Sequence, residues 1–151
     1  MQTKKILSIL LAFLLMGTLF FSISHEDKIT HDKVSYADDI TEKILMGINN
    51  DSYSMYSSDF NESLKKTQSE EYFGKTNKDL RDKLGEYQSK KFYTAVRTRS
   101  YENKKLISYF TVVYKARFSK SDKDAVVNAT FRDEDGNISV NGFYINAEKL
   151  H

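Results

Sequence analysis

The chain has 151 residues, of which 40% are hydrophobic, a composition that suits one compact domain and argues against global disorder. When Lys4 and Lys5 are left out, 21 basic residues balance 21 acidic ones, so the rest of the chain lacks the basic excess of a nucleic-acid-binding protein. The absence of cysteine excludes disulfides, thiolate-bound zinc, iron–sulfur clusters and cysteine nucleophiles.

Residues 1–24 have the pattern of a segment for export across a membrane. Lys4 and Lys5 precede an almost unbroken apolar run over residues 6–23, which is long enough to span a bilayer. Residues 22–24 contain two small serines that suit signal-peptide cleavage, so a cleaved signal peptide and an uncleaved membrane anchor both stay open. In either case we expect the rest of the chain on the extracytoplasmic side, anchored to the membrane or secreted.

The polar residues 25–34 are predicted to form a short tether, and residues 35–151 to form an α+β domain. Behind Ser35, which suits a helix N-cap, apolar residues recur at helical spacing. These apolar residues are Ala37, Ile40, Ile44 and Ile48. A shorter helix is expected over residues 52–58. Its apolar side is supplied by Tyr53, Tyr56 and Phe60.

A third helix is predicted between a capping box and a glycine. Residues 67–70 read Thr-Gln-Ser-Glu, the pattern in which two side chains satisfy the first N–H groups of a helix. Phe73 and Leu84 belong to its apolar stripe, and Gly85 is placed to end it. Because glycine weakens a helix interior, Gly74 is expected to break this helix near its middle.

The last third of the chain predicts a four-stranded antiparallel meander over residues 91–100, 106–118, 125–132 and 138–145. Asp135-Gly136 is the strongest hairpin signal. Side chains alternate between the two faces of a strand, and one face is expected to pack on the helices. That face contains Phe92, Val96, Phe110, Val112, Tyr114, Ala116, Phe118, Val127, Ala129 and Phe131. Gly142 is predicted to mark a bulge in the last strand.

About three helices, the link Leu84-Gly85-Glu86-Tyr87 and a meander that ends in Val140-Asn141-Gly142-Phe143-Tyr144 resemble the cystatin-like, nuclear transport factor 2-like superfamily. More narrowly, the chain is similar to small exported bacterial families of this superfamily that are domains of unknown function. The resemblance covers residues 35–147, with residues 50–53 at the first joint between helices. It implies a curved sheet around a long helix, in some members a conical pocket, and frequent dimerisation through the sheet. It implies no activity, because this fold hosts enzymes, binding modules and assembly domains.

No catalytic site, cofactor or bound metal is expected. His25, His31 and His151 lie in the predicted tether or at the last residue, where a flexible segment cannot hold a catalytic base in place. The predicted inward face of the sheet has no ionisable group except Tyr114. The acidic turn at residues 133–137 lacks the Gly and Glu that a calcium loop requires, and the glycines form no nucleotide-binding fingerprint.

The main functional hypothesis is a non-catalytic protein-interaction or assembly module that uses the outward face of the sheet. Tyrosine and arginine are enriched at binding hot spots, and several are predicted to gather on this face, opposite a partner or a second copy of the chain. They are Tyr93, Arg97, Arg99, Tyr101, Tyr109 and Arg117. An ordinary solvated sheet face is the alternative, because these residue types also suit one.

The second hypothesis is a domain that binds a small ligand in a pocket between the helices and the concave sheet. Its predicted lining consists of Tyr53, Tyr56, Phe60, Tyr114 and Tyr144. Aromatic residues at such spacings also fill cores, so close packing without a cavity is the alternative.

Overall fold

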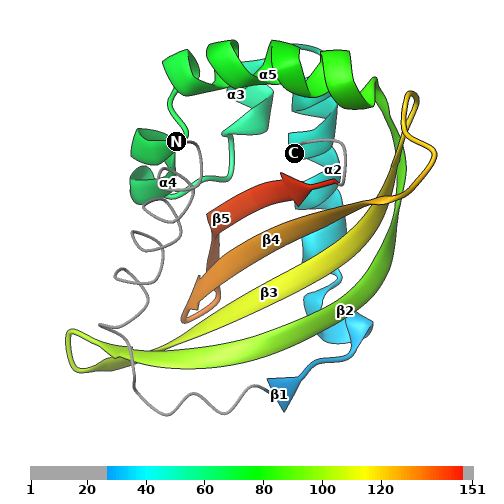
Figure 1. The fold of residues 1–151 in the computed structure, drawn as a ribbon. Coiled ribbons are helices and arrows are strands. Elements are labelled where there is room, and N and C mark those ends of the chain that lie inside the picture. Colours follow the sequence, from blue (N-terminus) through cyan, green and yellow to red (C-terminus); the bar gives the residue numbers. More distant parts are fainter. Residues whose placement is uncertain (1–26, 148–151) are drawn as a thin grey trace, which may run out of the picture.

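A five-stranded antiparallel sheet organises the part of the chain that the computed structural model describes, residues 27–147 (Figure 1). The strands follow one another in the sheet in chain order. They are β1 (Asp27–Lys28), β2 (Tyr87–Glu102), β3 (Lys105–Phe118), β4 (Ala125–Glu134) and β5 (Asn137–Asn146). The four predicted strands are confirmed, and both central residues of the Asp135-Gly136 turn have the positive φ of a tight hairpin.

A 3-10 helix and four α-helices cover the inner face of the sheet and one of its ends, where inner face means the side toward the helices (Figure 1). They are η1 (His31–Val34), α2 (Tyr36–Asn49), α3 (Tyr53–Tyr56), α4 (Glu62–Thr67) and α5 (Glu70–Leu84). Figure 1 shows α2 behind the sheet and α5 across its end. The domain is therefore α+β, as predicted, with one α-helix, one 3-10 helix and one short strand more than expected.

The helix boundaries correct three local predictions. Helix α4 was not predicted, because Leu64 is the single buried residue in its sequence. Thr67 ends α4, and the N-cap of α5 is Ser69, whose hydroxyl accepts a hydrogen bond from the Tyr72 amide. Gly74 lies within an unbroken α5. Gly85 ends α5 as predicted, with φ at 79°.

The segment predicted as a tether belongs to the fold from Asp27 onward. Asp27 pairs with Arg97 on β2, and the amide of Ile29 donates to the carbonyl of Ala95 at 2.9 Å. Val34 is fully buried in the core. Among residues 27–147 no helix is long and apolar enough to cross a membrane, and the apolar segment over residues 1–24 lies outside the described part.

A bulge in β2 changes which side chains face the helices. Phe92 pairs with Tyr114 and Thr94 with Val113, so Tyr93 is the extra residue. Cross-strand partners share a face, and the alternation therefore shifts by one after the bulge. Ala95, not Val96, is buried on the inner face. The other predicted inward positions are opposite one another on β2, β3 and β4 as expected.

Polar groups join α2 to the inner face of β2 and β3. Tyr87 donates to Glu42 through its hydroxyl at 2.7 Å, and Lys90 contacts the same carboxylate oxygen at 2.9 Å. One turn earlier on α2, Asp38 accepts a hydrogen bond from the Tyr114 hydroxyl at 2.8 Å. Burial and the bond to Glu42 raise the pKa of Tyr87, and burial and the bond to Asp38 raise the pKa of Tyr114. These tyrosines therefore seat α2 on the sheet in their neutral form.

Alanine substitutions at two helix glycines test how closely the helices pack. A Cβ on Gly47 would lie 2.6 Å from the Tyr56 nitrogen, so Gly47→Ala must push α3 away from α2. We expect Gly47→Ala to lower the free energy of unfolding by about 1–3 kcal/mol. Gly74→Ala, on the exposed side of α5 with nothing within 4 Å, should raise it by about 0.5–1 kcal/mol. Urea unfolding measures both, and a Gly47→Ala variant as stable as the parent would contradict the close contact.

The raised pKa of Tyr36 predicts that the domain loses stability at alkaline pH. Burial and, to a lesser extent, Asp133 raise its pKa to about 12 from an ordinary value of 10.0. As the pH rises, Tyr36 ionises in the unfolded chain before it ionises in the folded domain. The stability that neutral Tyr36 gives to the folded state is therefore complete below about pH 10 and is lost as the pH rises through about 12. Unfolding free energies measured across this range should fall less steeply in Tyr36→Phe. The buried Tyr36 hydroxyl has no hydrogen-bond partner among the described residues, so the substitution should cost little at neutral pH.

Candidate functional site between α5 and β5

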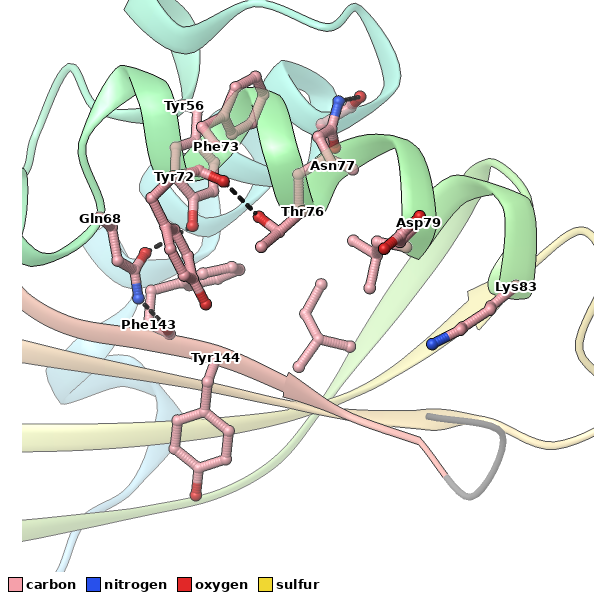
Figure 2. A pocket seen from close by; sticks show the side chains of 13 residues that line it. Tyr56, Gln68, Tyr72, Phe73, Thr76, Asn77, Asp79, Lys83, Phe143 and Tyr144 are labelled. Atoms are coloured by element: carbon pink, nitrogen blue, oxygen red, sulfur yellow. Dashed lines mark hydrogen bonds between the residues drawn. The ribbon is translucent and has the colours of Figure 1, made fainter. Parts of the chain in front are cut away.

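An open pocket of about 350 Å³ lies between α5 and the edge strand β5 (Figure 2). Six of its thirteen lining residues are apolar or aromatic side chains from α2, α3, α5 and β5 that form the middle of the wall. They are Ile48, Tyr56, Phe73, Leu80, Phe143 and Ile145. Thr76, on the exposed surface of α5, lines its mouth. The pocket therefore joins the domain core to the surface at the edge of the sheet.

The pocket begins where the chain stops covering the edge of β5. Before it, residues 59–61 run beside β5: the Asn61 amide donates to the Val140 carbonyl at 2.9 Å, and the Val140 amide donates to the Asp59 carbonyl at 2.7 Å. The Asn61 side chain also donates to that of Asn141 at 2.6 Å. The chain then turns away into α4, and the second half of β5 is left beside the pocket.

Gln68 connects the two walls at this end of the pocket. Its side-chain amide donates to the Phe143 carbonyl at 2.8 Å, and its carbonyl oxygen accepts the Tyr56 hydroxyl at 2.5 Å (Figure 2). Tyr56 is only 7% exposed, and this burial raises the pKa of its hydroxyl. The hydroxyl therefore stays neutral and donates a hydrogen bond to the side-chain oxygen of Gln68.

Asn77 supplies a buried polar group on the α5 side. Its side chain is 3% exposed, and its amide nitrogen donates to the Ile48 carbonyl at 3.1 Å and to the Asp51 carboxylate at 2.6 Å. Its oxygen has no hydrogen-bond partner within residues 27–147. A buried acceptor without a partner costs stability, and this oxygen is closed to solvent on every side.

The charged residues of the pocket lie toward the C-terminal end of α5. Asp79 and Lys83 both line it, and Figure 2 shows the Lys83 ammonium extending from the last turn of the helix toward the cavity. In the described part of the chain Lys83 makes no salt bridge. The site thus has an apolar middle, hydrogen-bonding groups at Gln68 and Asn77, and one charge of each sign at the far end.

Two of the five residues predicted to line a pocket, Tyr56 and Tyr144, border this one, and the other three do not. Tyr56 lies in the pocket wall, whereas Tyr53, Phe60 and Tyr114 pack outside it. Tyr144 borders the pocket through its position on β5, but Figure 2 shows its ring pointing away, and it is 60% exposed. Tyr144 lies opposite Asn128 on the outer face, because the strand alternates and Phe143 takes the inward position.

Sequence reasoning missed the contribution of α5. Phe73, Thr76 and Leu80 form one stripe on this helix, and such a stripe ordinarily packs flat on a core. Here α5 lies across the end of the sheet, so the stripe faces β5 over a gap. The sequence did contain one sign of this pocket: the stripe on α5 includes the polar Thr76 and is followed by Asp79 and Lys83.

The predicted partner face is divided by the β2 bulge between two sides of the sheet. Arg97, Arg99 and Tyr101 pair with Phe110, Ser108 and Leu106, which places them on the inner side, contrary to the prediction. Tyr93, Tyr109 and Arg117 remain with the outer face; the Lys115 ammonium lies 4.5 Å from the centre of the Tyr93 ring. The six residues therefore do not form one surface.

Besides Tyr93, four of these side chains make hydrogen bonds or ion pairs within the chain, and one of the four, Arg99, lies 3.9 Å from the Asp27 carboxylate. Tyr109 donates to Glu102 at 2.5 Å, and Arg132 contacts the same carboxylate at 3.4 Å. Arg117 donates to the Asp122 carbonyl at 3.1 Å. Arg97 contacts Asp27 at 2.7 Å on the inner side. These bonds join neighbouring strands and turns, so they stabilise the sheet and its hairpins.

His31 is held in the fold instead of lying in a flexible tether. Its ring stacks on Phe92 with 4.4 Å between centroids, and its Nε2 lies 2.7 Å from the Asp38 carboxylate. Its side chain is 47% exposed, at the α2–β2 seam and outside the pocket. Within residues 27–147 no cluster of three or more His, Asp or Glu side chains is placed to bind a metal ion.

Gln68 provides a test of how the pocket walls are joined. Gln68→Ala leaves the buried Tyr56 hydroxyl without its acceptor and should lower the free energy of unfolding by about 1–3 kcal/mol. In a Tyr56→Phe background the same substitution should cost less, because no buried hydroxyl is left unpaired. A double-mutant cycle by urea unfolding gives the coupling, and strictly additive effects would contradict the bond.

Comparison with known proteins identifies one match. The family described as "Protein of unknown function (DUF3887)" matches residues 41–143, from within α2 to Phe143 on β5. No curated protein and no solved structure matches the chain. The resemblance to the cystatin-like superfamily therefore stays a prediction. Because the match covers more than half of the chain, the protein belongs to the DUF3887 family.

Proposed function

We propose that this domain is a non-catalytic binding module and that its binding site is the pocket between α5 and β5. One observation carries the proposal: an open pocket of about 350 Å³ is lined by side chains of both walls. Ligand sites commonly have volumes of roughly 300–1,000 Å³, with apolar walls and a few placed polar groups. This pocket lies at the small end of that range, so it suits one compact apolar group.

The polar groups of the pocket are suited to holding a ligand and poorly suited to catalysis. Gln68 and Asn77 are amides, which do not exchange protons near neutral pH. Asp79 and Lys83 lie together at one end, and among the described residues that line the pocket there is no histidine and no nucleophile paired with a base. Orientation by hydrogen bonds is the role that this lining supports.

We infer from the sequence that binding takes place outside the cytoplasmic membrane. The apolar run behind Lys4 and Lys5 supports export, either with residues 1–24 as an anchor or with the domain secreted after their removal. Protein sequencing of the mature amino terminus distinguishes these two forms.

The outer face of the sheet is a second candidate, for contact with a protein or a second copy of the chain. Exposed aromatic rings favour it: Tyr93 is 61% and Tyr144 60% exposed, with Val126 between them on β4 at 38%. Tyrosine is common at binding hot spots. Solution mass measured over a range of protein concentrations tests for self-association through this face.

The absence of native cysteine allows a direct test of the pocket by disulfide capture. Thr76→Cys places a thiol at the pocket mouth, and Lys75→Cys places one on the neighbouring exposed position of α5, away from the pocket. Each full-length variant is equilibrated with a mixture of 2-phenylethanethiol and 2-mercaptoethanol in a redox buffer. Intact-mass spectrometry then measures which thiol is captured.

We expect Thr76→Cys to capture the phenyl compound roughly tenfold more than Lys75→Cys does, because about 1.4 kcal/mol of apolar contact gives that ratio. The Lys75→Cys variant corrects for partition of the phenyl compound into detergent or lipid. Equal preference in the two variants would show that the pocket does not hold an apolar group and would overturn the proposal.

A further inference from the structure

We propose that the ligand of this pocket is an extended peptide segment of a partner protein, which pairs with residues 143–146 of β5 as an additional strand and places one apolar side chain in the pocket. The inference rests on the proposed function of the pocket. It adds the chemical class of the ligand and the direction in which it lies.

The backbone of β5 presents hydrogen-bonding groups toward the pocket. Both the amide and the carbonyl of Val140 bond to residues 59–61, so Val140 faces the edge of the sheet. Asn141 is the extra residue of a bulge, since Phe131 pairs with Val140 and Thr130 with Gly142. The Gln68 bond to the Phe143 carbonyl shows that Phe143 also faces the edge. By alternation along an antiparallel strand, Ile145 faces the same edge.

The open part of this edge is short and well defined. Residues 59–61 occupy the edge at Val140, and Gln68 gives the Phe143 carbonyl the amide donor that an added strand would supply. Among the described residues, the Ile145 backbone has no hydrogen bond of this kind outside its own sheet. Unpaired edge groups of this type pair readily with another extended chain.

Helix α5 supplies the opposite wall and limits what can enter. Phe73 and Leu80 on α5 and Phe143 and Ile145 on β5 line the same cavity, so a chain lying along β5 passes between helix and strand. Successive side chains of a strand point in opposite directions, and every second one would therefore be able to enter the pocket. The cavity of about 350 Å³ fits a single such side chain.

This geometry favours a peptide over the other occupants. A second folded copy would bring its own sheet to the edge, and α5 lies where that sheet would continue (Figure 1). A single extended strand fits between α5 and β5. At about 3.3 Å per residue, residues 143–146 span roughly 13 Å, the length of about four peptide residues. Because Gln68 already bonds the Phe143 carbonyl, the pairing within this span uses the amide and carbonyl of Ile145. A small apolar molecule would fill the cavity and leave the Ile145 backbone unpaired.

The test uses the full-length chain and the peptide acetyl-Thr-Val-Thr-Phe-Thr-Val-Thr-amide with two backbone-methylated analogues. One analogue carries N-methyl groups at its second, fourth and sixth residues, the other at its third and fifth. The side chains are the same in all three, but each analogue loses the donors along one edge of the strand. Fluorescence anisotropy of labelled peptides gives the affinities, and amide hydrogen exchange followed by NMR reports on Ile145.

We expect the parent peptide to bind and to slow exchange of the Ile145 amide. One of the two analogues should lose about tenfold or more in affinity, equivalent to about 1.4 kcal/mol, while the other binds like the parent. If both analogues bind like the parent, or if the parent peptide does not bind, strand pairing is wrong even where disulfide capture at Thr76→Cys shows an apolar pocket. The two proposals therefore fail separately.

Exchange of the Ile145 amide without peptide identifies the alternative occupants. Slow exchange that depends on protein concentration would assign the edge to a second copy of the chain. Slow exchange that is independent of concentration would assign it to a segment of the same chain. Either result would overturn the proposal of an external peptide, whereas rapid exchange that slows on peptide addition supports it.

Discussion

The arrangement of the helices depends on how the chain covers half of the β5 edge. Two backbone hydrogen bonds at Val140 fix residues 59–61 beside the strand, and Gln68 makes a third contact further along. These bonds set the positions of α3 before them and of α4 and α5 after them. Helix α5 must begin next to β5 and yet pass over the end of the sheet to reach β2, and the pocket is the space left by that path.

Much of the fold could be predicted from local patterns. The strands over β2 to β5 follow from runs of β-branched and aromatic residues, and the Asp135-Gly136 turn follows from the backbone freedom of these two residue types. The long helices follow from their apolar spacing. Helix α4 could not be predicted, because it is stabilised by its connection to β5 through Asn61 and by the single buried Leu64.

The predicted partner face failed because one inserted residue reverses the faces of β2. The extra residue Tyr93 sends Arg97 and Tyr101 to the side opposite to the predicted one. Sequence shows no mark of this bulge, since Tyr93 is an ordinary strand residue. In β5 the glycine did indicate the bulge, which lies at Asn141 beside Gly142, but only the pairing with β4 shows which of Phe143 and Tyr144 faces inward.

The polar seam between α2 and the sheet has a consequence for how the domain folds. Asp38 meets Tyr114 across 76 positions of the chain, and Glu42 meets Tyr87 across 45. A chain emerging amino terminus first presents α2 long before β3 exists to receive it. Such distant contacts must pay loop-closure entropy before they give any stabilisation, which slows folding. The contacts that seat α2 on the sheet can therefore form only after β2 and β3 have emerged.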